Sequence, residues 1–290
     1  MIIVTGATGR LGRAIANRLL ERIPADRICV SVRDPAKARD LADRGVRVRR
    51  GDFTEPSTLA TAFAGATQVM LVSGPADPAP HKDAIEAAKT AGAEHIVYTS
   101  HMAAAAPSLF APAQGHAQTE RDLQEAGVPF TSLRDGFHAT SAMWMLGDAL
   151  QTGEIRLPAD GPVSWTAHAD LADAAVIALT DHDRLHGLTP ALTGSEALDF
   201  GDIAAIASEL TGRSITRTTV SDDDYVATLL ADGTPRQHAD MLLTNFIACR
   251  RGEFAAVDPT LSRLLGRPPI PFRDVLASAL AQTNATTTRS

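Results

Sequence analysis

Lysine and tyrosine are scarce in this sequence, and their spacing excludes one kind of redox chemistry. Lysine occurs only at positions 37, 82 and 89, and tyrosine only at positions 98 and 225. Neither tyrosine has a lysine four residues further on. The chain therefore lacks the pair in which a cation lowers the phenol pKa for proton transfer. We expect no alcohol oxidation by that route.

Cysteine is also scarce. Cys29 and Cys249 are far apart, lie in apolar segments and fit no C-x-x-C spacing, so we expect buried thiols in a reducing compartment. The sequence has no G-x-S-x-G elbow, no H-E-x-x-H and no cysteine cluster. It therefore gives no support for a hydrolase or a zinc enzyme, and we predict no metal site.

Long apolar runs and an excess of positive charge are missing as well. No apolar run approaches the roughly eighteen residues that span a bilayer, and no basic leader with a small-residue cleavage site precedes the first apolar segment. The formal net charge of −7 argues against a nucleic-acid-binding surface. We expect a cytoplasmic protein whose partner is a small molecule, without nucleic acid or membrane, and with a homodimer as the form of any self-association.

The first twelve residues organise the rest of the chain. An apolar segment, 1–5, precedes three glycines spaced by three and then a helical pattern, which is the arrangement of a dinucleotide-binding βαβ unit. A pyrophosphate would lie on the N–H groups at the helix start. A glycine turn that binds nothing is the alternative. The predicted phosphate-binding residues are Gly6, Thr8, Gly9, Arg10, Leu11 and Gly12.

Strands and helices alternate through the first half of the 290 residues, and the second half is mainly helical. We predict an α/β fold, a Rossmann-type doubly wound parallel sheet with a smaller, mainly helical C-terminal lobe. The NADP-binding domain would span 1–150, completed by parts of 151–195. The substrate-binding lobe would span 151–283, followed by a disordered tail over 284–290. The expected strands of the sheet are 1–5, 28–32, 46–49, 68–73, 95–100 and 129–134, with a late strand at 188–193.

The end of the second expected strand favours NADP over NAD. An acidic residue at this position would bind the ribose hydroxyls of NAD, but here Arg33 follows the strand and Lys37 lies one helical turn further on. A guanidinium can hold a 2′-phosphate in a bidentate grip. Asp34 is the competing candidate and would serve NAD, although Asp34-Pro35 already has the pattern of a helix cap.

Two further stretches lie where the adenosine and nicotinamide halves would bind. Asp52 could accept from the adenine amine and Phe53 could cover its ring, or the two could form a simple turn with a core phenylalanine. Ser73, Gly74 and Pro75 end the fourth strand at the topological switch point, where the backbone would pass close to the ribose and nicotinamide.

The ends of the fifth and sixth strands supply candidates for the acceptor side of the site. Ser100 could hydrogen-bond a substrate carbonyl, and His101 lies next to it. Phe137 and His138 could form a wall beside the nicotinamide that Trp144 extends. For each histidine, a purely structural role is an equal alternative.

The sequence as a whole resembles the NmrA-like atypical short-chain dehydrogenases, most strongly the branch of NADPH-dependent quinone oxidoreductases and triphenylmethane-dye reductases. The resemblance implies direct hydride transfer from NADPH to a conjugated acceptor, without flavin or metal. Such an acceptor needs little proton chemistry, which fits the missing tyrosine–lysine pair. The matching segments are 4–12, 32–38, 51–53, 71–75, 98–100, 116–120, 133–137 and 264–266.

Two positions depart from the family pattern. Asp135 stands where relatives tend to have asparagine, and His138 stands where they often have tyrosine. The two side chains could pair and supply a proton, so we place both among the catalytic candidates. Two other functions stay open: a redox-sensing regulator of the NmrA type that binds NADP without turnover, and a reductase dedicated to one biosynthetic substrate.

Overall fold

The computed structural model describes residues 1–74, 77–181 and 183–287, with side chains up to residue 282. The chain passes between two compact units several times. The first unit consists of Met1–Ala106, Pro112–Asp135 and His168–Leu192, and the second of Pro107–Ala111, Gly136–Ala167 and Thr193–Ser290.

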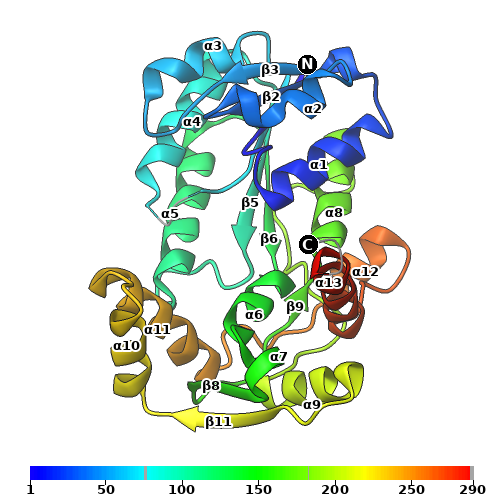
Figure 1. Cartoon of the computed structure of the whole chain (residues 1–290). Helices are drawn as coiled ribbons and strands as arrows, with labels where there is room; N and C mark the ends of the chain where they lie inside the picture. The colour runs from blue at the N-terminus through cyan, green and yellow to red at the C-terminus, as the bar shows by residue number, and fades with distance from the viewer. Residues whose placement is uncertain (75–76, 182, 288–290) are drawn as a thin grey trace. The chain divides into compact units, whose positions relative to one another are not determined.

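The first unit is built on a seven-stranded sheet in which every neighbouring pair is parallel (Figure 1). Its spatial order is β10-β6-β5-β4-β1-β2-β3. The chain thus builds outward from β1 in one direction and then from β4 in the other, which is the doubly wound topology predicted from the sequence. The strands are β1 (Ile2–Thr5), β2 (Ile28–Val32), β3 (Arg47–Arg50), β4 (Gln68–Leu71), β5 (His95–His101), β6 (Phe130–Asp135) and β10 (Gly187–Leu188).

Helices cover both faces of this sheet, which is why the central strands are apolar on both sides. On one face, side chains of α3 (Leu59–Phe63), α4 (Ala79–Thr90) and α5 (Ala111–Ala126) enclose a buried cluster with the strands. On the other face, α8 (His168–Thr180) packs on the strands and on α1 (Arg10–Leu20). Short 3₁₀ turns and α2 (Arg39–Ala42) complete the connections.

The late strand is shorter than predicted. The sequence suggested extended structure over 188–193, but β10 covers only Gly187–Leu188. Pro190 has no N–H to donate, so the ladder with β6 is interrupted there. Thr189 and Leu192 still donate backbone hydrogen bonds to Ser132 and Arg134, which keeps this segment along the sheet edge.

The second unit is mainly helical and contains two small parallel ribbons, β7 with β9 and β8 with β11. Its last helix continues to Thr287, into the stretch 284–290 for which the sequence predicts a disordered tail. Among the described residues, none of the helices has the length and apolar character required to cross a bilayer. The elements are β7 (Phe137–His138), α6 (Ala139–Leu146), α7 (Ala149–Thr152), β8 (Glu154–Pro158), β9 (Trp165–Thr166), α9 (Phe200–Thr211), β11 (Thr216–Val220), α10 (Asp222–Ala231), α11 (Arg236–Arg250), α12 (Thr260–Leu265) and α13 (Phe272–Thr287).

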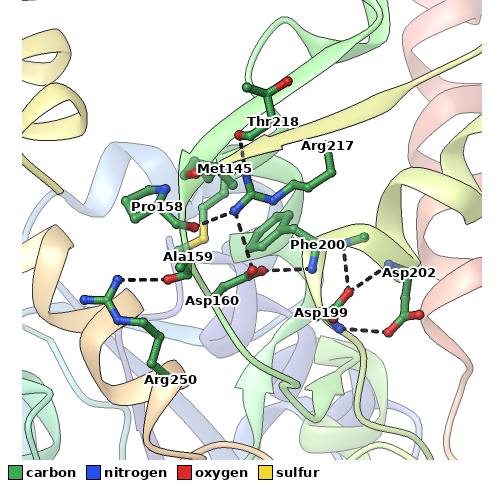
Figure 2. A network of polar contacts seen from close by, with 12 residues as sticks. Met145, Pro158, Ala159, Asp160, Asp199, Phe200, Asp202, Arg217, Thr218 and Arg250 are labelled. Atoms are coloured by element: carbon green, nitrogen blue, oxygen red, sulfur yellow. Dashed lines mark hydrogen bonds and ion pairs between the residues drawn. The ribbon is translucent and has the colours of Figure 1, made fainter. Parts of the chain in front are cut away.

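A half-buried arginine joins three elements of the second unit (Figure 2). The guanidinium of Arg217, on β11, donates to the carbonyl oxygen of Pro158 at 2.5 Å and forms an ion pair with Asp160 at 3.5 Å. Asp160 in turn accepts from the backbone N–H of Phe200 at 2.9 Å, at the start of α9. Burial raises the pKa of Asp160. The network ties β8, β11 and α9 together through groups that would be costly to leave unpaired.

Candidate functional site

The glycine turn after β1 has the backbone geometry that phosphate binding requires. Gly6 adopts a positive φ of 62°, which side chains rarely tolerate. A Cβ atom on Gly12 would lie 2.4 Å from the carbonyl oxygen of Gly6, so only glycine allows this close approach of helix to turn. Gly9 is the N-cap of α1 and has no side chain to accept from the helix N–H groups. Among the described residues no side chain caps this helix start, so its N–H groups and dipole face outward for an anion.

The remaining predicted residues of this turn divide by exposure. Thr8 and Arg10 are exposed beside the turn, whereas Leu11 is buried and anchors α1 to the sheet. The charge of Arg10 contributes to a lowered pKa of His168, the first residue of α8, although burial is the larger cause. The helix start is therefore lined by positive charge as well as by N–H groups.

The segment after β2 presents basic side chains and uses its acidic one internally. Arg33 and Lys37 are exposed. The carboxylate of Asp34 accepts from the backbone N–H of Ala36 at 3.0 Å and caps a 3₁₀ turn, with Pro35 at its first position. The predicted capping role of Asp34 is confirmed, so the acid that would have served NAD is already engaged.

An ion pair that the sequence did not reveal braces this segment against α1. The guanidinium of Arg13 donates to both carboxylate oxygens of Asp40, at 2.7 and 2.6 Å, and to the carbonyl oxygen of Lys37 at 2.9 Å. These hydrogen bonds lower the pKa of Asp40. The partners are 27 residues apart, so no local pattern could have pointed to them.

Asp52 and Phe53 make the contacts of a turn and a core residue. The carboxylate of Asp52 accepts from the N–H and the hydroxyl of Thr54, at 2.9 and 2.8 Å. Those bonds, followed by the charges of Arg33 and Arg50, lower its pKa. Phe53 is half-buried against the core and lies edge-on to a buried imidazole. Their role at an adenine ring stays a prediction.

The segment after β4 lies at the switch point between β1 and β4, as expected. Ser73 donates its backbone N–H to the hydroxyl of Thr99 at 2.7 Å, and the same hydroxyl donates to Ser73 Oγ at 3.0 Å. Gly74 is exposed. Pro75, also predicted to bind cofactor, lies outside the described residues.

Ser100 is buried rather than open to a ligand. Its hydroxyl donates to Glu120 at 2.8 Å, and the same carboxylate accepts from Ser132 at 2.9 Å and from the guanidinium of Arg134 at 3.0 and 2.6 Å. This contact uses the hydroxyl hydrogen that a substrate carbonyl would need. One sequence feature could have indicated the cluster: Glu120 lies on the same helical face as Ala113, Ala117 and Leu123, which are all buried.

His101 lies in a row of rings at the end of β5. Its Nδ1 accepts from the backbone N–H of Ala103 at 3.1 Å, and its ring stacks on His116 with centroids 6.0 Å apart. The Nδ1 atom of His116 lies 2.7 Å from the hydroxyl of Tyr98. Burial lowers the pKa of His116 to about 4, so this imidazole is neutral at physiological pH. These contacts give both histidines a structural role, the alternative left open by the sequence.

Asp135 ends β6 as a buried carboxyl group. It is 3% exposed, and within the part of the chain that the structure describes its Oδ1 atom has no hydrogen-bond partner. Burial raises its pKa well above the usual range, which favours the protonated form. It is thus a potential proton donor. Its predicted pairing with His138 stays a prediction, because His138 belongs to the second unit.

Phe137 and Trp144 have opposite environments within the second unit. Phe137 is buried in an aromatic cluster, with ring centroids 5.0 Å from Phe254 and 5.4 Å from Trp165. It therefore acts as a core residue of this unit. Trp144, on α6, is 61% exposed, more than any other large hydrophobic side chain in the described chain. Its role in substrate binding is not tested by these contacts.

No group of three or more His, Cys, Asp or Glu side chains in the described ranges is arranged to hold a metal ion. The uncapped helix start, the close glycine approach and the exposed Arg33 and Lys37 all fit a phosphorylated dinucleotide.

Comparison with known proteins gives the same answer. The family model described as the NmrA-like family matches residues 1–266. The chain belongs to the NmrA-like family. Quinone oxidoreductase 2 of Escherichia coli is 34% identical over 274 residues, which cover 92% of this chain and 94% of that protein.

Two solved structures resemble this chain along almost its whole length. The NADPH-dependent quinone oxidoreductase of Escherichia coli complexed with NADPH matches with a TM-score of 0.90 and 31% identity, covering 97% of this chain and 100% of that one. The Citrobacter triphenylmethane reductase complexed with NADP(H) matches with a TM-score of 0.87 and 31% identity, covering 96% and 100%.

Proposed function

We propose that this NmrA-like protein is an NADPH-dependent oxidoreductase that reduces quinones or similar conjugated acceptors. The observation that carries the proposal is the combination of an uncapped helix start behind the glycine turn with basic side chains, not a free acid, after β2. Full-length similarity to a quinone oxidoreductase complexed with NADPH supports the same cofactor and the same kind of acceptor.

Each part of the cofactor has residues of this chain to hold it. The glycine turn and the N–H groups of α1 would bind the pyrophosphate. Arg33 and Lys37 would bind the 2′-phosphate. In our proposal, Asp52 and Phe53 face the adenine, and Ser73, Gly74 and Pro75 lie along the ribose and nicotinamide.

The chemistry that remains for the protein is mostly positioning. When bound, NADPH supplies the hydride. The chain has no tyrosine–lysine pair to move a proton, so we propose direct transfer to an electrophilic acceptor without flavin or metal. Catalysis would then depend on holding nicotinamide and acceptor in near-attack geometry.

The candidate residues on the acceptor side come from the ends of β5 and β6, from β7 and from α6. We retain Asp135 and His138 as the groups that supply a proton, because Asp135 is buried and burial raises its pKa. In our proposal Ser100 and His101 do not contact the acceptor directly. Ser100 acts through its hydrogen bond to Glu120, and His101 acts through its ring stacking on His116. Trp144 is the exposed side chain that we expect to line the path of the acceptor. We further propose that the protein acts in the cytoplasm on a small molecule, which its acidic net charge supports over a nucleic acid.

The experiment that tests this function is NADPH oxidation against a panel of quinones, triphenylmethane dyes and enones. We expect acceptor-dependent loss of absorbance at the reduced-nicotinamide band, and faster turnover with NADPH than with NADH. Equal binding of oxidised and reduced cofactor with no turnover on any acceptor would favour the redox-sensing regulator instead. Turnover with a single acceptor only would favour the dedicated reductase.

The cofactor preference is tested by replacing Arg33 with alanine. Loss of one or two charge-assisted hydrogen bonds to the 2′-phosphate should lower the NADPH/NADH affinity ratio about ten- to a hundredfold. The measurement is the dissociation constant of each cofactor by calorimetry. Arg27→Ala removes an exposed arginine away from β2's carboxyl end and should leave the ratio unchanged. An unchanged ratio in Arg33→Ala would remove Arg33 from the site.

A further inference from the structure

Three consecutive backbone N–H groups, those of residues 72–74, leave the sheet after β4 and have no strand to pair with. Each one donates instead to a side chain from a different element. The acceptors are Thr5 Oγ1 at 2.9 Å from β1, Thr99 Oγ1 at 2.7 Å from β5 and His81 Nε2 at 3.2 Å from α4. The three N–H groups of this segment therefore donate to side chains and not to a neighbouring strand.

The hydrogen bonds of His81 determine its tautomer. The N–H of Gly74 can only donate, so Nε2 of His81 carries no hydrogen. On the other side of the ring, Nδ1 lies 3.1 Å from Thr119 Oγ1, whose own hydrogen goes to the carbonyl oxygen of Gly115. Nδ1 therefore carries the hydrogen and donates it to Thr119. His81 is a neutral imidazole whose single acceptor atom points at the 72–74 segment.

Burial keeps the imidazole in this state. His81 is 2% exposed, and burial lowers its pKa to about 4, although the carboxylates of Asp77 and Asp122 act in the opposite direction. The edges and faces of Phe53 and Tyr98 enclose the ring, with centroids 6.0 and 5.7 Å away. Two hydrogen bonds and two aromatic contacts thus leave the ring one orientation.

We propose that His81, together with Thr5 and Thr99, is a positioning residue that shapes segment 72–74 to receive the ribose–nicotinamide half of NADPH. This inference rests on the proposed function. Because all three N–H groups are already used, the backbone of the segment offers acceptors to a ligand, namely its carbonyl oxygens. It therefore recognises hydrogen-bond donors, such as ribose hydroxyls or the carboxamide NH₂, whereas the glycine turn offers N–H groups to phosphate.

The proposal assigns segment 72–74 and the glycine turn to different parts of NADPH, so binding measurements alone can test it. His81→Leu removes the acceptor for Gly74 and keeps the site apolar. We expect the dissociation constant for NADPH to rise about five- to tenfold, the loss typical of one hydrogen bond. The constant for adenosine 2′,5′-bisphosphate, which lacks the nicotinamide half, should stay within about twofold of wild type. Both constants are measured by isothermal titration calorimetry.

Two further variants separate positioning from general packing. His81→Gln places an amide oxygen near the position of Nε2 and should recover most of the NADPH affinity. Tyr98→Phe is the matched control: it keeps the buried ring, removes the hydroxyl that contacts His116 and Thr119, and leaves the acceptor for Gly74 in place, so it should leave both constants unchanged. If His81→Leu does not fold, Thr99→Val removes the acceptor for Ser73 with little change in shape and should produce the same split.

Three results would overturn the proposal: equal loss of affinity for both ligands in His81→Leu, no loss for NADPH, or no recovery in His81→Gln. The same split in Tyr98→Phe would also overturn it, because the effect would then belong to the cluster as a whole. Failure of the proposed function looks different: the wild-type protein would then either bind neither NADPH nor the bisphosphate, or bind NADPH and turn over none of the acceptors.

Discussion

At the scale of single residues, the burial of the Asp135 carboxyl group indicates a functional role. This carboxyl group lies at the end of a buried strand, is 3% exposed and has one oxygen without a partner among the residues that the structure describes, so it loses the hydration that stabilises its charge. The folded protein therefore keeps the proton at pH values where the unfolded chain releases it. Such a residue lowers stability near neutral pH, and its retention is understandable if the proton is used.

Asp135→Asn should reveal this cost as a change in the pH dependence of stability. Because the folded pKa is raised, the free energy of unfolding of the wild type falls as pH rises above about 4, by about 1.4 kcal/mol per unit from this group. Asparagine does not ionise, so the variant should gain stability relative to wild type between pH 4 and pH 7, by more than about 1 kcal/mol. Urea denaturation at several pH values measures the difference.

The exposed acid Asp26 provides the comparison, because Asp26→Asn should give a curve parallel to wild type. A parallel curve for Asp135→Asn would mean that Asp135 is ionised in the folded protein. The same variant also tests the proposed pairing with His138: if its pH–rate profile does not move, we would abandon that pairing.

At the scale of elements, α1 lies very close to the glycine turn that follows β1. The helix approaches the turn so closely that one added methyl group at Gly12 would overlap the backbone of Gly6. The brace from Arg13 to Asp40 then ties the same helix to the segment that carries Lys37. The groups that we propose to bind phosphate, in two different connections, are thus positioned by one helix.

Gly12→Ala should disturb this arrangement in proportion to the overlap. We expect a loss of about 1 to 3 kcal/mol in the free energy of unfolding, as for other overpacked positions, together with weaker NADPH binding. Gly9→Ala is the matched variant, because its Cβ would lie 3.3 Å from the same carbonyl oxygen and would need a much smaller shift. Chemical denaturation and calorimetry compare the two. Equal effects at both positions would show that helix approach is not what the glycines provide.

For the whole molecule, cofactor binding should appear as stability. A ligand that binds only the folded state raises the free energy of unfolding by about 2.7 kcal/mol at a hundred times its dissociation constant. We therefore expect NADPH to raise the melting temperature more than NADH at equal concentration. In Arg33→Ala the two cofactors should give nearly equal shifts. Equal shifts in the wild-type protein would contradict NADPH selectivity.

Several features of this molecule follow from neighbouring residues and were accessible before the fold was known. The apolar strands, the glycine spacing after 1–5, the cap at Asp34-Pro35 and the basic residue Arg33 are all local patterns. Local patterns determine backbone conformation directly, through allowed dihedral angles, capping and burial periodicity. They were enough for the fold class, the cofactor and the family.

The contacts that shape the site have a different origin. Ser100 meets Glu120, Arg13 meets Asp40, and Gly74 meets His81 only because strands and helices distant in sequence pack together. A buried polar group must find a partner or lose its charge, and its position along the chain does not say which outcome applies. For this reason only the tertiary structure could show that Ser100 is a buried contact of Glu120 and that burial raises the pKa of Asp135.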